Sequence, residues 1–387
     1  MRAPNVGKGR PVLATRRSRG KRTDSGEGLR LSLASRNLRA PPPSAESARP
    51  IPMELQIRNL SKQYPNGVQA LDDVSLTIPT GMYGLLGPNG AGKSTLMRTL
   101  ATLQEPDAGS ATLTTAGPGG ADLDVLADKT ALRRSLGYLP QEFGVYPKVP
   151  AFDLLDHFAV LKGVTDKRQR RELVEALLHQ TNLWKARTKH LGGYSGGMKQ
   201  RFGIAVALIG DPRLIIVDEP TAGLDPAERV RFLNLLSELG EDSVVILSTH
   251  IVEDVAELCS RMAIINEGRI RFEGDPLAAT ASLRGKIWKR VVDKADLPAL
   301  RQEQEVISDR LLVGRVVVHV YAEASPGPDY APVEPDLEDV YFCTLRGLLD
   351  DALRTGGAAE AGRDTPPVGA GAVAELESGS STPTLSS

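Results

Sequence analysis

Residues 87–94 form a pattern that can hold phosphate groups. They read Gly-x-x-x-x-Gly-Lys-Ser, with an apolar segment before them and a helix expected from Lys93 onward. Glycines at these spacings let backbone N–H groups turn inward around phosphate oxygens. The lysine would reach the β- and γ-phosphates, the serine hydroxyl would bind Mg²⁺, and the helix would add its positive N-terminal dipole. The candidate phosphate-binding residues are Gly87, Pro88, Asn89, Gly90, Ala91, Gly92, Lys93, Ser94 and Thr95.

Two carboxylates follow a short apolar segment further along the chain. Leu214–Val217 are four apolar residues, and Asp218 and Glu219 come directly after them. A buried strand that ends in acids presents them at the sheet edge where a phosphate loop also lies. Asp218 is then placed to hold Mg²⁺ through its water shell, and Glu219 to polarise an attacking water. Together the two patterns predict a P-loop nucleoside triphosphatase.

A third pattern narrows this class. Residues 194–201 read Tyr-Ser-Gly-Gly-Met-Lys-Gln-Arg, and taken alone Ser-Gly-Gly could simply cap a helix. At this place, shortly before the acidic strand, the segment resembles the signature motif of ABC-type ATPases. Two departures stand out: the motif begins with Tyr194 and has Met198 after the glycines, where Leu and Gln are commonest. The Ser-Gly-Gly centre is intact, so we expect a competent motif.

Four further positions resemble the same family in its own order. Gln141 resembles the Q-loop glutamine, Ala222–Asp225 the D-loop, and His250 the switch histidine. Tyr64, ahead of the phosphate loop, resembles the aromatic residue that stacks on adenine, although an aromatic there is also commonly core or turn packing. The resemblance covers residues 54–275.

The resemblance implies that ATP and Mg²⁺ are held between two subunits arranged head to tail, either two copies of this chain or this chain and a homologue. Glu219, His250, Gln141 and Lys93 would be catalytic. Ser94, Gln141 and Asp218 would hold the metal ion. These residues would act on nucleotide bound to their own subunit, whereas Ser195, Gly196 and Gly197 would contact nucleotide bound to the partner.

Apolar segments alternate with helical patterns along the rest of this region. We expect an α/β fold, with a P-loop NTPase core, a mainly parallel sheet, an antiparallel β subdomain and a helical subdomain at about 151–191. Another strand is expected at Leu311–Tyr321. The expected strands are Leu55–Leu60, Leu71–Ile78, Met82–Leu86, Leu214–Asp218, Ser243–Ser248 and Arg261–Ile265. The chain then divides into a tail (1–52), an ATPase domain (53–275), an accessory region (276–355) and a disordered tail (356–387).

Composition places these elements in an ordinary globular protein of 387 residues, with two cysteines that fit a reducing compartment. No window approaches the ~18–20 apolar residues of a bilayer-spanning helix. If the protein serves a membrane, another chain must cross it. The resemblance therefore implies an integral-membrane permease as partner and a place at the cytoplasmic face of the cell membrane.

Residues 1–52 differ from the rest, with 12 Lys and Arg against 3 Asp and Glu. Rich in Arg, Ser and Pro, they predict disorder. They could be an arm that binds nucleic acid or anionic lipid, or a targeting peptide. Alternatively, the chain could start at Met53, which opens directly into a strand pattern. They do not form a secretory signal, because a continuous apolar segment is missing.

Residues 335–341, Pro-Asp-Leu-Glu-Asp-Val-Tyr, resemble a segment that ends many subunits of the drug, lipid and polysaccharide exporter branch, although an acidic helix start explains them equally well. The alternative to a transporter subunit is a soluble ABC ATPase that acts on nucleic acid, ribosomes or cofactor assembly. A single phosphate loop, and the lack of room for a long coiled coil in 96–194, argue against nucleic acid as a partner. A regulatory subunit without catalysis is disfavoured by Glu219 and His250.

Overall fold

The computed structural model describes residues 53–114, 122–141, 143–144, 146–221, 224–240 and 242–349. The expectations for the basic segment 1–52 and the tail 356–387 lie outside these residues. So do positions 222 and 223 of the D-loop and the end of the accessory region, from 350 onward.

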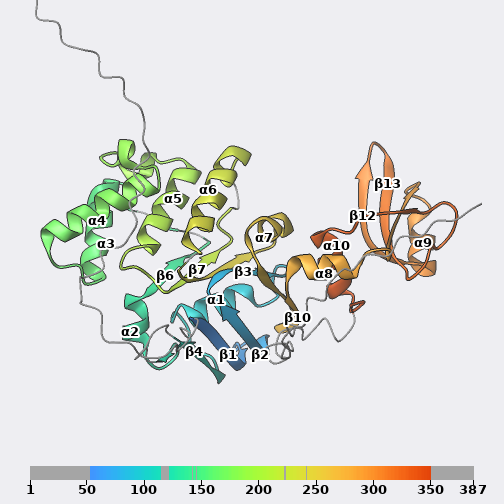
Figure 1. Cartoon of the computed structure of the whole chain (residues 1–387), viewed down its shortest axis with the longest axis horizontal. Helices are drawn as coiled ribbons and strands as arrows, with labels where there is room; N and C mark the ends of the chain where they lie inside the picture. Colours follow the sequence, from blue (N-terminus) through green and yellow to red (C-terminus); the bar gives the residue numbers. More distant parts are fainter. Residues whose placement is uncertain are drawn as a thin grey trace, which may run out of the picture. The chain divides into compact units, whose positions relative to one another are not determined.

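A six-stranded sheet lies between helices at the centre of the domain (Figure 1). Its order is β10-β9-β3-β8-β7-β6, and every neighbouring pair is parallel except β10 with β9. The expected mainly parallel sheet is thus confirmed. The strands are β3 (Gly81–Leu86), β6 (Leu136–Leu139), β7 (Leu214–Asp218), β8 (Val244–Thr249), β9 (Arg261–Asn266) and β10 (Arg269–Gly274).

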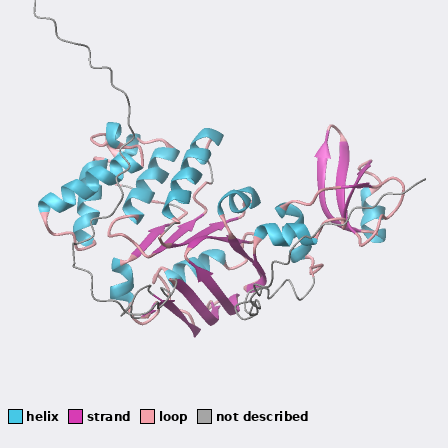
Figure 2. Cartoon of the chain, in the orientation of Figure 1, coloured by secondary structure: helices cyan, strands magenta, loops and turns pink. Residues whose placement is uncertain are grey.

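Both faces of this sheet are buried, which explains why its strands read as continuous apolar runs. In β7, Leu214 and Ile216 face one core cluster, while Ile215 and Val217 face another. Helix α1 (Lys93–Leu100) belongs to the first cluster. Helices α5 (Gly196–Ala207) and α6 (Pro226–Leu239) cover the second face (Figure 2).

An antiparallel sheet in the order β2-β1-β4-β5 packs against the other side of α1, so the expected antiparallel subdomain is also present. Its strands are β1 (Glu54–Gln63), β2 (Gln69–Pro79), β4 (Ala108–Thr114) and β5 (Leu123–Asp124), and helix α2 (Lys129–Arg134) follows. At its start, the Met53 carbonyl accepts hydrogen bonds from the backbone N–H and hydroxyl of Thr80.

The helical subdomain consists of α3 (Ala151–Leu161), α4 (Lys167–Gln180) and two short 3₁₀ turns at Trp184–Ala186 and Leu191–Gly193. Phe202 and Ala205 on one face of α5, and Ile209 just after this helix, complete its apolar core. Helix α5, which starts within the signature segment, therefore joins this subdomain to the central sheet.

The chain continues through α7 (Val252–Leu258) and α8 (Pro276–Ser282) into a second antiparallel sheet, in the order β12-β13-β11-β14, with α9 beside it. Its elements are β11 (Ile287–Val292), α9 (Leu297–Glu303), β12 (Glu305–Leu312), β13 (Arg315–Tyr321) and β14 (Ala331–Pro332). Helix α10 (Leu337–Leu345) then packs its apolar face, including Val340 and Cys343, against the cluster shared with α7.

The expectation of one strand at Leu311–Tyr321 is wrong, because the chain turns there. β12 ends at Leu312 and β13 begins at Arg315. Val313 and Gly314 between them have φ of 48° and 81°, the positive values that a tight hairpin turn requires. Apolar residues continue into the turn, so the hydrophobic pattern of the sequence gives no sign of it. Within the described residues, no helix has the length and apolar character needed to cross a bilayer.

Candidate nucleotide-binding site

The parallel strands bring the predicted catalytic residues to one sheet edge. Lys93 lies in the first turn of the helix after β3, Glu219 directly follows β7, and His250 directly follows β8. Because β3, β8 and β7 are neighbours and parallel, their carboxyl ends coincide. Three segments far apart in the sequence therefore meet at one place.

The Glu219 carboxylate is the centre of this group. Its Oε2 accepts a hydrogen bond of 2.9 Å from Nε2 of Gln141. Its Oε1 lies 3.3 Å from Nδ1 of His250 and 3.9 Å from Nζ of Lys93. Gln141 and His250 come from loops that nothing in the local sequence connects, so this convergence is a product of the fold.

Backbone conformation turns Glu219 out of its strand. Its φ is 47°, a left-handed value that is uncommon for a residue with a side chain. The Glu219 N–H still donates to the Ser248 carbonyl at 2.8 Å, which ties the turn to the neighbouring strand β8. Strain of this kind costs of order 1–3 kcal/mol and is concentrated at functional sites.

The phosphate loop is closed by its own lysine. Lys93 Nζ donates to the carbonyls of Gly87 at 2.6 Å and Pro88 at 3.1 Å, and its side chain is buried. Burial lowers the pKa of the Lys93 ammonium, while the Glu219 and Asp218 carboxylates act against that shift. Gly92 has a φ of 110°, and a Cβ there would lie 2.4 Å from the Ala70 carbonyl. Only glycine fits this position.

A buried polar group beside the loop fits the expected metal ion. Asp218 and Ser248 are both buried, and among the described residues neither Asp218 Oδ1 nor Ser248 Oγ has a hydrogen-bond partner. Burial raises the pKa of the Asp218 carboxyl, the nearby Glu219 carboxylate adds to this shift, and the Lys93 ammonium opposes it. A divalent cation nearby would satisfy the orphaned carboxylate oxygen. Ser248 was not among the predicted site residues, since a serine inside an apolar strand carries no distinctive signal.

Tyr64 is tethered to the phosphate-loop helix. Its hydroxyl lies 3.2 Å from Thr95 Oγ1 and 3.2 Å from Gln104 Oε1. Gln104 Nε2 in turn donates to the Thr95 carbonyl and to Thr99 Oγ1. Sequence reasoning missed Gln104, because it follows α1 without any motif of its own.

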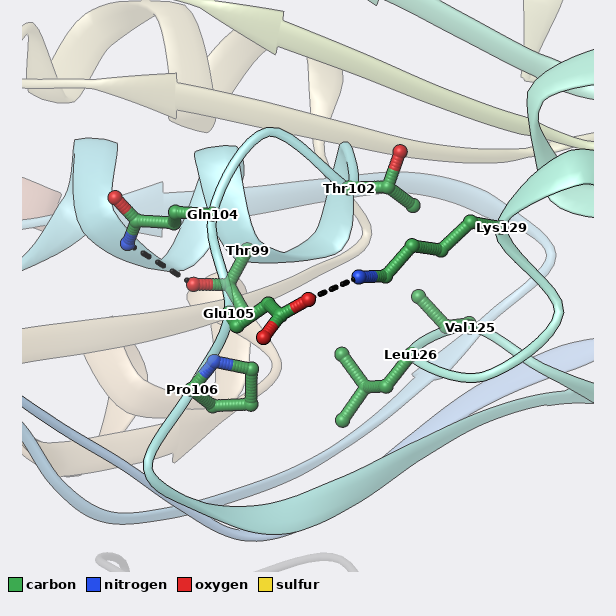
Figure 3. Close-up of a pocket in the computed structure, with 8 residues that line it drawn as sticks. All are labelled: Thr99, Thr102, Gln104, Glu105, Pro106, Val125, Leu126 and Lys129. Carbon is green, nitrogen blue, oxygen red and sulfur yellow. Dashed lines mark hydrogen bonds and ion pairs between the residues drawn. The ribbon is translucent and has the colours of Figure 1, made fainter.

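Gln104 also lines a cavity of about 290 Å³ next to the site. Figure 3 shows two interactions in the lining of this cavity. Gln104 is hydrogen-bonded to Thr99, and Glu105 forms an ion pair with Lys129, with the charged atoms 2.5 Å apart. The rest of the lining is Thr102, Pro106, Val125 and Leu126. The cavity has no residue in common with the predicted site.

The signature segment does act as a helix cap, as its residue types allow. Ser195 is the N-cap of α5, and its side chain accepts from the Met198 N–H at 3.3 Å. A side chain on Gly196 would meet nothing within 4 Å, so this helix start is open. Among the described residues, no hydrogen bond or ion pair joins Ser195, Gly196 or Gly197 to the phosphate loop.

The two unusual signature residues serve the helical subdomain. Tyr194 is buried, donates its hydroxyl proton to the Ala186 carbonyl at 3.0 Å, and packs its ring edge-on against Phe202. Met198 packs against the same apolar cluster. Both departures from the common motif therefore have a packing explanation and leave the Ser-Gly-Gly centre free.

The sheet order, the phosphate loop between β3 and α1, and the carboxylates at the end of β7 define a P-loop nucleoside triphosphatase. The family model described as ABC transporter matches residues 71–222. The daunorubicin/doxorubicin resistance ATP-binding protein DrrA of Streptomyces peucetius is 32% identical over 274 residues, which cover 70% of this chain and 78% of that protein. This chain therefore belongs to the ATP-binding proteins of the ABC transporter family.

Two further comparisons place it within this family. The probable multidrug ABC transporter ATP-binding protein YbhF of Escherichia coli K12 is 36% identical over 309 residues, or 76% of this chain; the match spans only about half of that relative, 52%. Among solved structures, the dimeric ATP-binding cassette MJ0796 bound to ADP and Pi is 25% identical, with a TM-score of 0.51. It covers 57% of this chain and 98% of the cassette.

Proposed function

We propose that this chain binds and hydrolyses ATP as one of two ATPase subunits that power a membrane permease, in the direction of export. The observation that carries the proposal is the convergence on Glu219. Gln141, His250 and Lys93 all approach its carboxylate from separate segments. A carboxylate held in this way, next to a phosphate-binding loop, is placed to orient and polarise a water molecule.

Each neighbour of Glu219 has its own role in this proposal. Lys93 neutralises charge on the β- and γ-phosphates, and the N–H groups of the phosphate loop bind their oxygens. His250 holds the γ-phosphate and the water in line. Tyr64 stacks on adenine, and its hydroxyl contacts with Thr95 and Gln104 hold it beside the loop.

Mg²⁺ is the proposed cofactor, held by Ser94, Gln141 and Asp218. When bound, it supplies positive charge against the phosphate oxygens. The orphaned oxygen of Asp218 supports this assignment. Gln141 donates to Glu219 through Nε2 at 2.9 Å, which leaves its amide oxygen as the metal-binding atom. The described residues contain no cluster of three or more His, Cys, Asp or Glu side chains that could hold a metal alone. This fits an ion whose remaining ligands are phosphate and water.

The position of the signature segment supports the proposal of a second ATPase subunit. Ser195, Gly196 and Gly197 do not contact the phosphate loop of their own chain, and Gly196 faces open space. A second subunit placed head to tail would bring its own Ser-Gly-Gly against this phosphate loop. The dimeric ABC cassette among the solved relatives supports this arrangement.

The permease partner is proposed to meet the helical subdomain and the loop after Gln141. Tyr146, Val160 and Leu161 are large apolar side chains on this part of the chain, with exposed fractions of 65%, 41% and 68%. Val160 and Leu161 are adjacent in the chain, and neighbouring exposed apolar groups are the kind of surface that a partner can cover. Contact there would place the chain at the cytoplasmic face of the cell membrane.

The direction of transport rests on two observations. The relatives YbhF and DrrA are named for multidrug transport and drug resistance. The C-terminal segment that resembles the exporter branch forms helix α10. The acidic residues of this segment also have a local role, because Asp336 and Asp339 form a capping box at the start of α10. The similarity to relatives named for drug transport therefore carries more weight than this segment.

Affinity purification of the Glu219→Gln variant from detergent-solubilised membranes with ATP tests this function. We expect a polytopic membrane protein at equal stoichiometry, identified by mass spectrometry, because the variant binds ATP but cannot release the dimer by hydrolysis. Glu334→Gln, an exposed carboxylate paired with Arg284, is the matched control and should keep wild-type hydrolysis. Wild-type hydrolysis in Glu219→Gln would contradict the role of Glu219. Ribosomal proteins, nucleic acid or soluble partners alone would contradict the transporter function.

A further inference from the structure

Asp254 is a buried carboxylate that no motif of the site includes. It lies on α7, and its side chain has an exposed fraction of 0%. Its Oδ2 accepts a hydrogen bond of 2.6 Å from the Thr221 hydroxyl. Its Oδ1 accepts one of 2.8 Å from Nε of Arg229. Both oxygens are thus occupied by partners from two other segments.

These partners flank the segment that resembles the D-loop. Thr221 stands two residues after Glu219, and Arg229 lies one turn into α6, whose N-cap is Asp225. Residues 222–225 connect Thr221 to the start of α6 in the sequence. One carboxylate therefore binds residues on both sides of this segment.

The same carboxylate lies close to the switch histidine along the chain. His250 follows β8, α7 begins at Val252, and Asp254 is in the first turn of that helix. Helix α7 is held from the other side as well, since Val255 is buried directly against Gly84 of β3. Asp254 is four residues from His250 and lies on a helix that these hydrogen bonds and the packing of Val255 both hold in place.

We infer that Asp254 is a positioning residue for ATP hydrolysis, acting through its bonds to Thr221 and Arg229. It fixes Thr221, two residues after Glu219, relative to α7, the helix that follows His250. The 3.3 Å approach between His250 Nδ1 and Glu219 Oε1 then depends on this link as well as on the pairing of β7 with β8. This inference rests on the proposed ATPase function.

Stability alone is a weak reason for this arrangement. A buried ion pair is often no more stabilising than apolar side chains of the same volume, because both charges lose their hydration. A short, directional link between two catalytic segments has a different benefit, since a displacement of about 1 Å can cost about 100-fold in rate.

Thr221→Val and Thr221→Ser separate positioning from packing. Valine keeps the shape and removes the hydroxyl, whereas serine keeps the hydroxyl and removes a methyl group. We expect kcat for ATP hydrolysis by the purified full chain to fall about tenfold or more in Thr221→Val and to stay within about twofold in Thr221→Ser. ATP affinity, measured with a fluorescent analogue, should stay within about twofold in both, because the phosphate loop is untouched.

Thr344→Val is the matched control. Thr344 is also buried, and its hydroxyl donates to the Val340 carbonyl at 2.7 Å on α10, away from the site. It should lower the melting temperature about as much as Thr221→Val and leave kcat unchanged. Equal kcat values for Thr221→Val and wild type would overturn the inference. A loss shared equally by Thr221→Ser would overturn it too, since packing would then be the cause.

The Asp254→Asn variant completes the test. If Thr221 acts through Asp254, adding Thr221→Val to Asp254→Asn should not reduce kcat by more than about a further twofold. A full additional tenfold loss would overturn the inference. Absence of hydrolysis in the wild-type chain would instead overturn the proposed function, and this is measured before any variant.

Discussion

Lys93 combines two tasks at the residue scale. Its ammonium donates to two carbonyls of the loop that contains it, and it also lies 3.9 Å from Glu219 Oε1. The lysine thus holds the shape of the phosphate loop while it is placed to receive phosphate. Removing it affects both the loop and the ligand.

Lys93→Ala should therefore reduce ATP affinity by about 10- to 100-fold, which is the loss expected for charge-assisted hydrogen bonds to phosphate. Isothermal titration or a fluorescent ATP analogue measures this. Lys162→Ala is the control, because Lys162 is a half-buried lysine that also donates to two backbone carbonyls, those of Arg133 and Leu136. Its loss should destabilise the fold and leave ATP affinity unchanged. A retained micromolar affinity in Lys93→Ala would contradict the role of this lysine.

Residue types at fixed spacing were enough to identify most of the candidate site. Gly92 and Lys93 follow a pattern whose chemistry is local, and Asp218 and Glu219 follow one strand. Gln104 and Asp254 could not be found in this way. Each acts through partners distant in sequence, such as Tyr64 and Thr221, and a lone glutamine or aspartate has many ordinary explanations.

At the scale of elements, α10 is attached to the second antiparallel sheet by a histidine. Nδ1 of His319, on β13, lies 2.8 Å from Oδ1 of the buried Asp339. Oδ2 of Asp339 accepts a hydrogen bond from the backbone N–H of Asp336 at the start of the helix. The hydrogen bond to Asp339 raises the pKa of His319 above its ordinary value of 6.5, and burial opposes this. The charged histidine is thus favoured in the folded chain.

The sign of the pH effect follows from this direction. Stabilisation by the charged pair is complete below pH 6.5 and is lost as the pH rises through the raised pKa of the folded protein. His319→Gln should lower the free energy of unfolding at pH 6 by about 1–2 kcal/mol, with a smaller effect at pH 9. Chemical denaturation at both pH values measures this, and the exposed His157→Gln is the control. An equal loss at both pH values would contradict a charged pair.

Element boundaries show where sequence patterns fail. The signal for β7 is strong because a buried parallel strand is apolar throughout. The hairpin between β12 and β13 has no such signal. Val313 is 97% exposed with a positive φ, although valine normally favours extended strands. Its conformation is imposed by the pairing of Leu312 with Arg315 across the turn.

At the scale of the whole molecule, the open start of α5 gives a test of the head-to-tail dimer. Gly196→Glu fits the fold, because a side chain there has free space and an acid at a helix start is favourable. The same acid would repel phosphate bound to a partner. We expect the Glu219→Gln variant to form a dimer in the presence of ATP, as measured by size-exclusion chromatography. The double variant Glu219→Gln with Gly196→Glu should remain monomeric under the same conditions.

The control for that variant is Gly327→Glu with Glu219→Gln. Gly327 also has room for a side chain, with its nearest neighbour, Tyr330, 3.8 Å from an added Cβ. The same charge is added away from the signature, so the ATP-dependent dimer should persist. Dimers of equal population in both double variants would contradict the role of Gly196 in the partner's site.

The class of the protein, its phosphate loop and its acidic strand could all be predicted from the amino-acid sequence. Each of these features depends on a few residue types that lie close together in the sequence. Their local backbone conformation follows from those residue types. Only the tertiary structure decided that Gln141, His250 and Lys93 share one carboxylate, and that Asp254 links Thr221 to Arg229. The physical reason is that parallel strand order brings distant segments to one edge, and this order is set by packing over the whole chain.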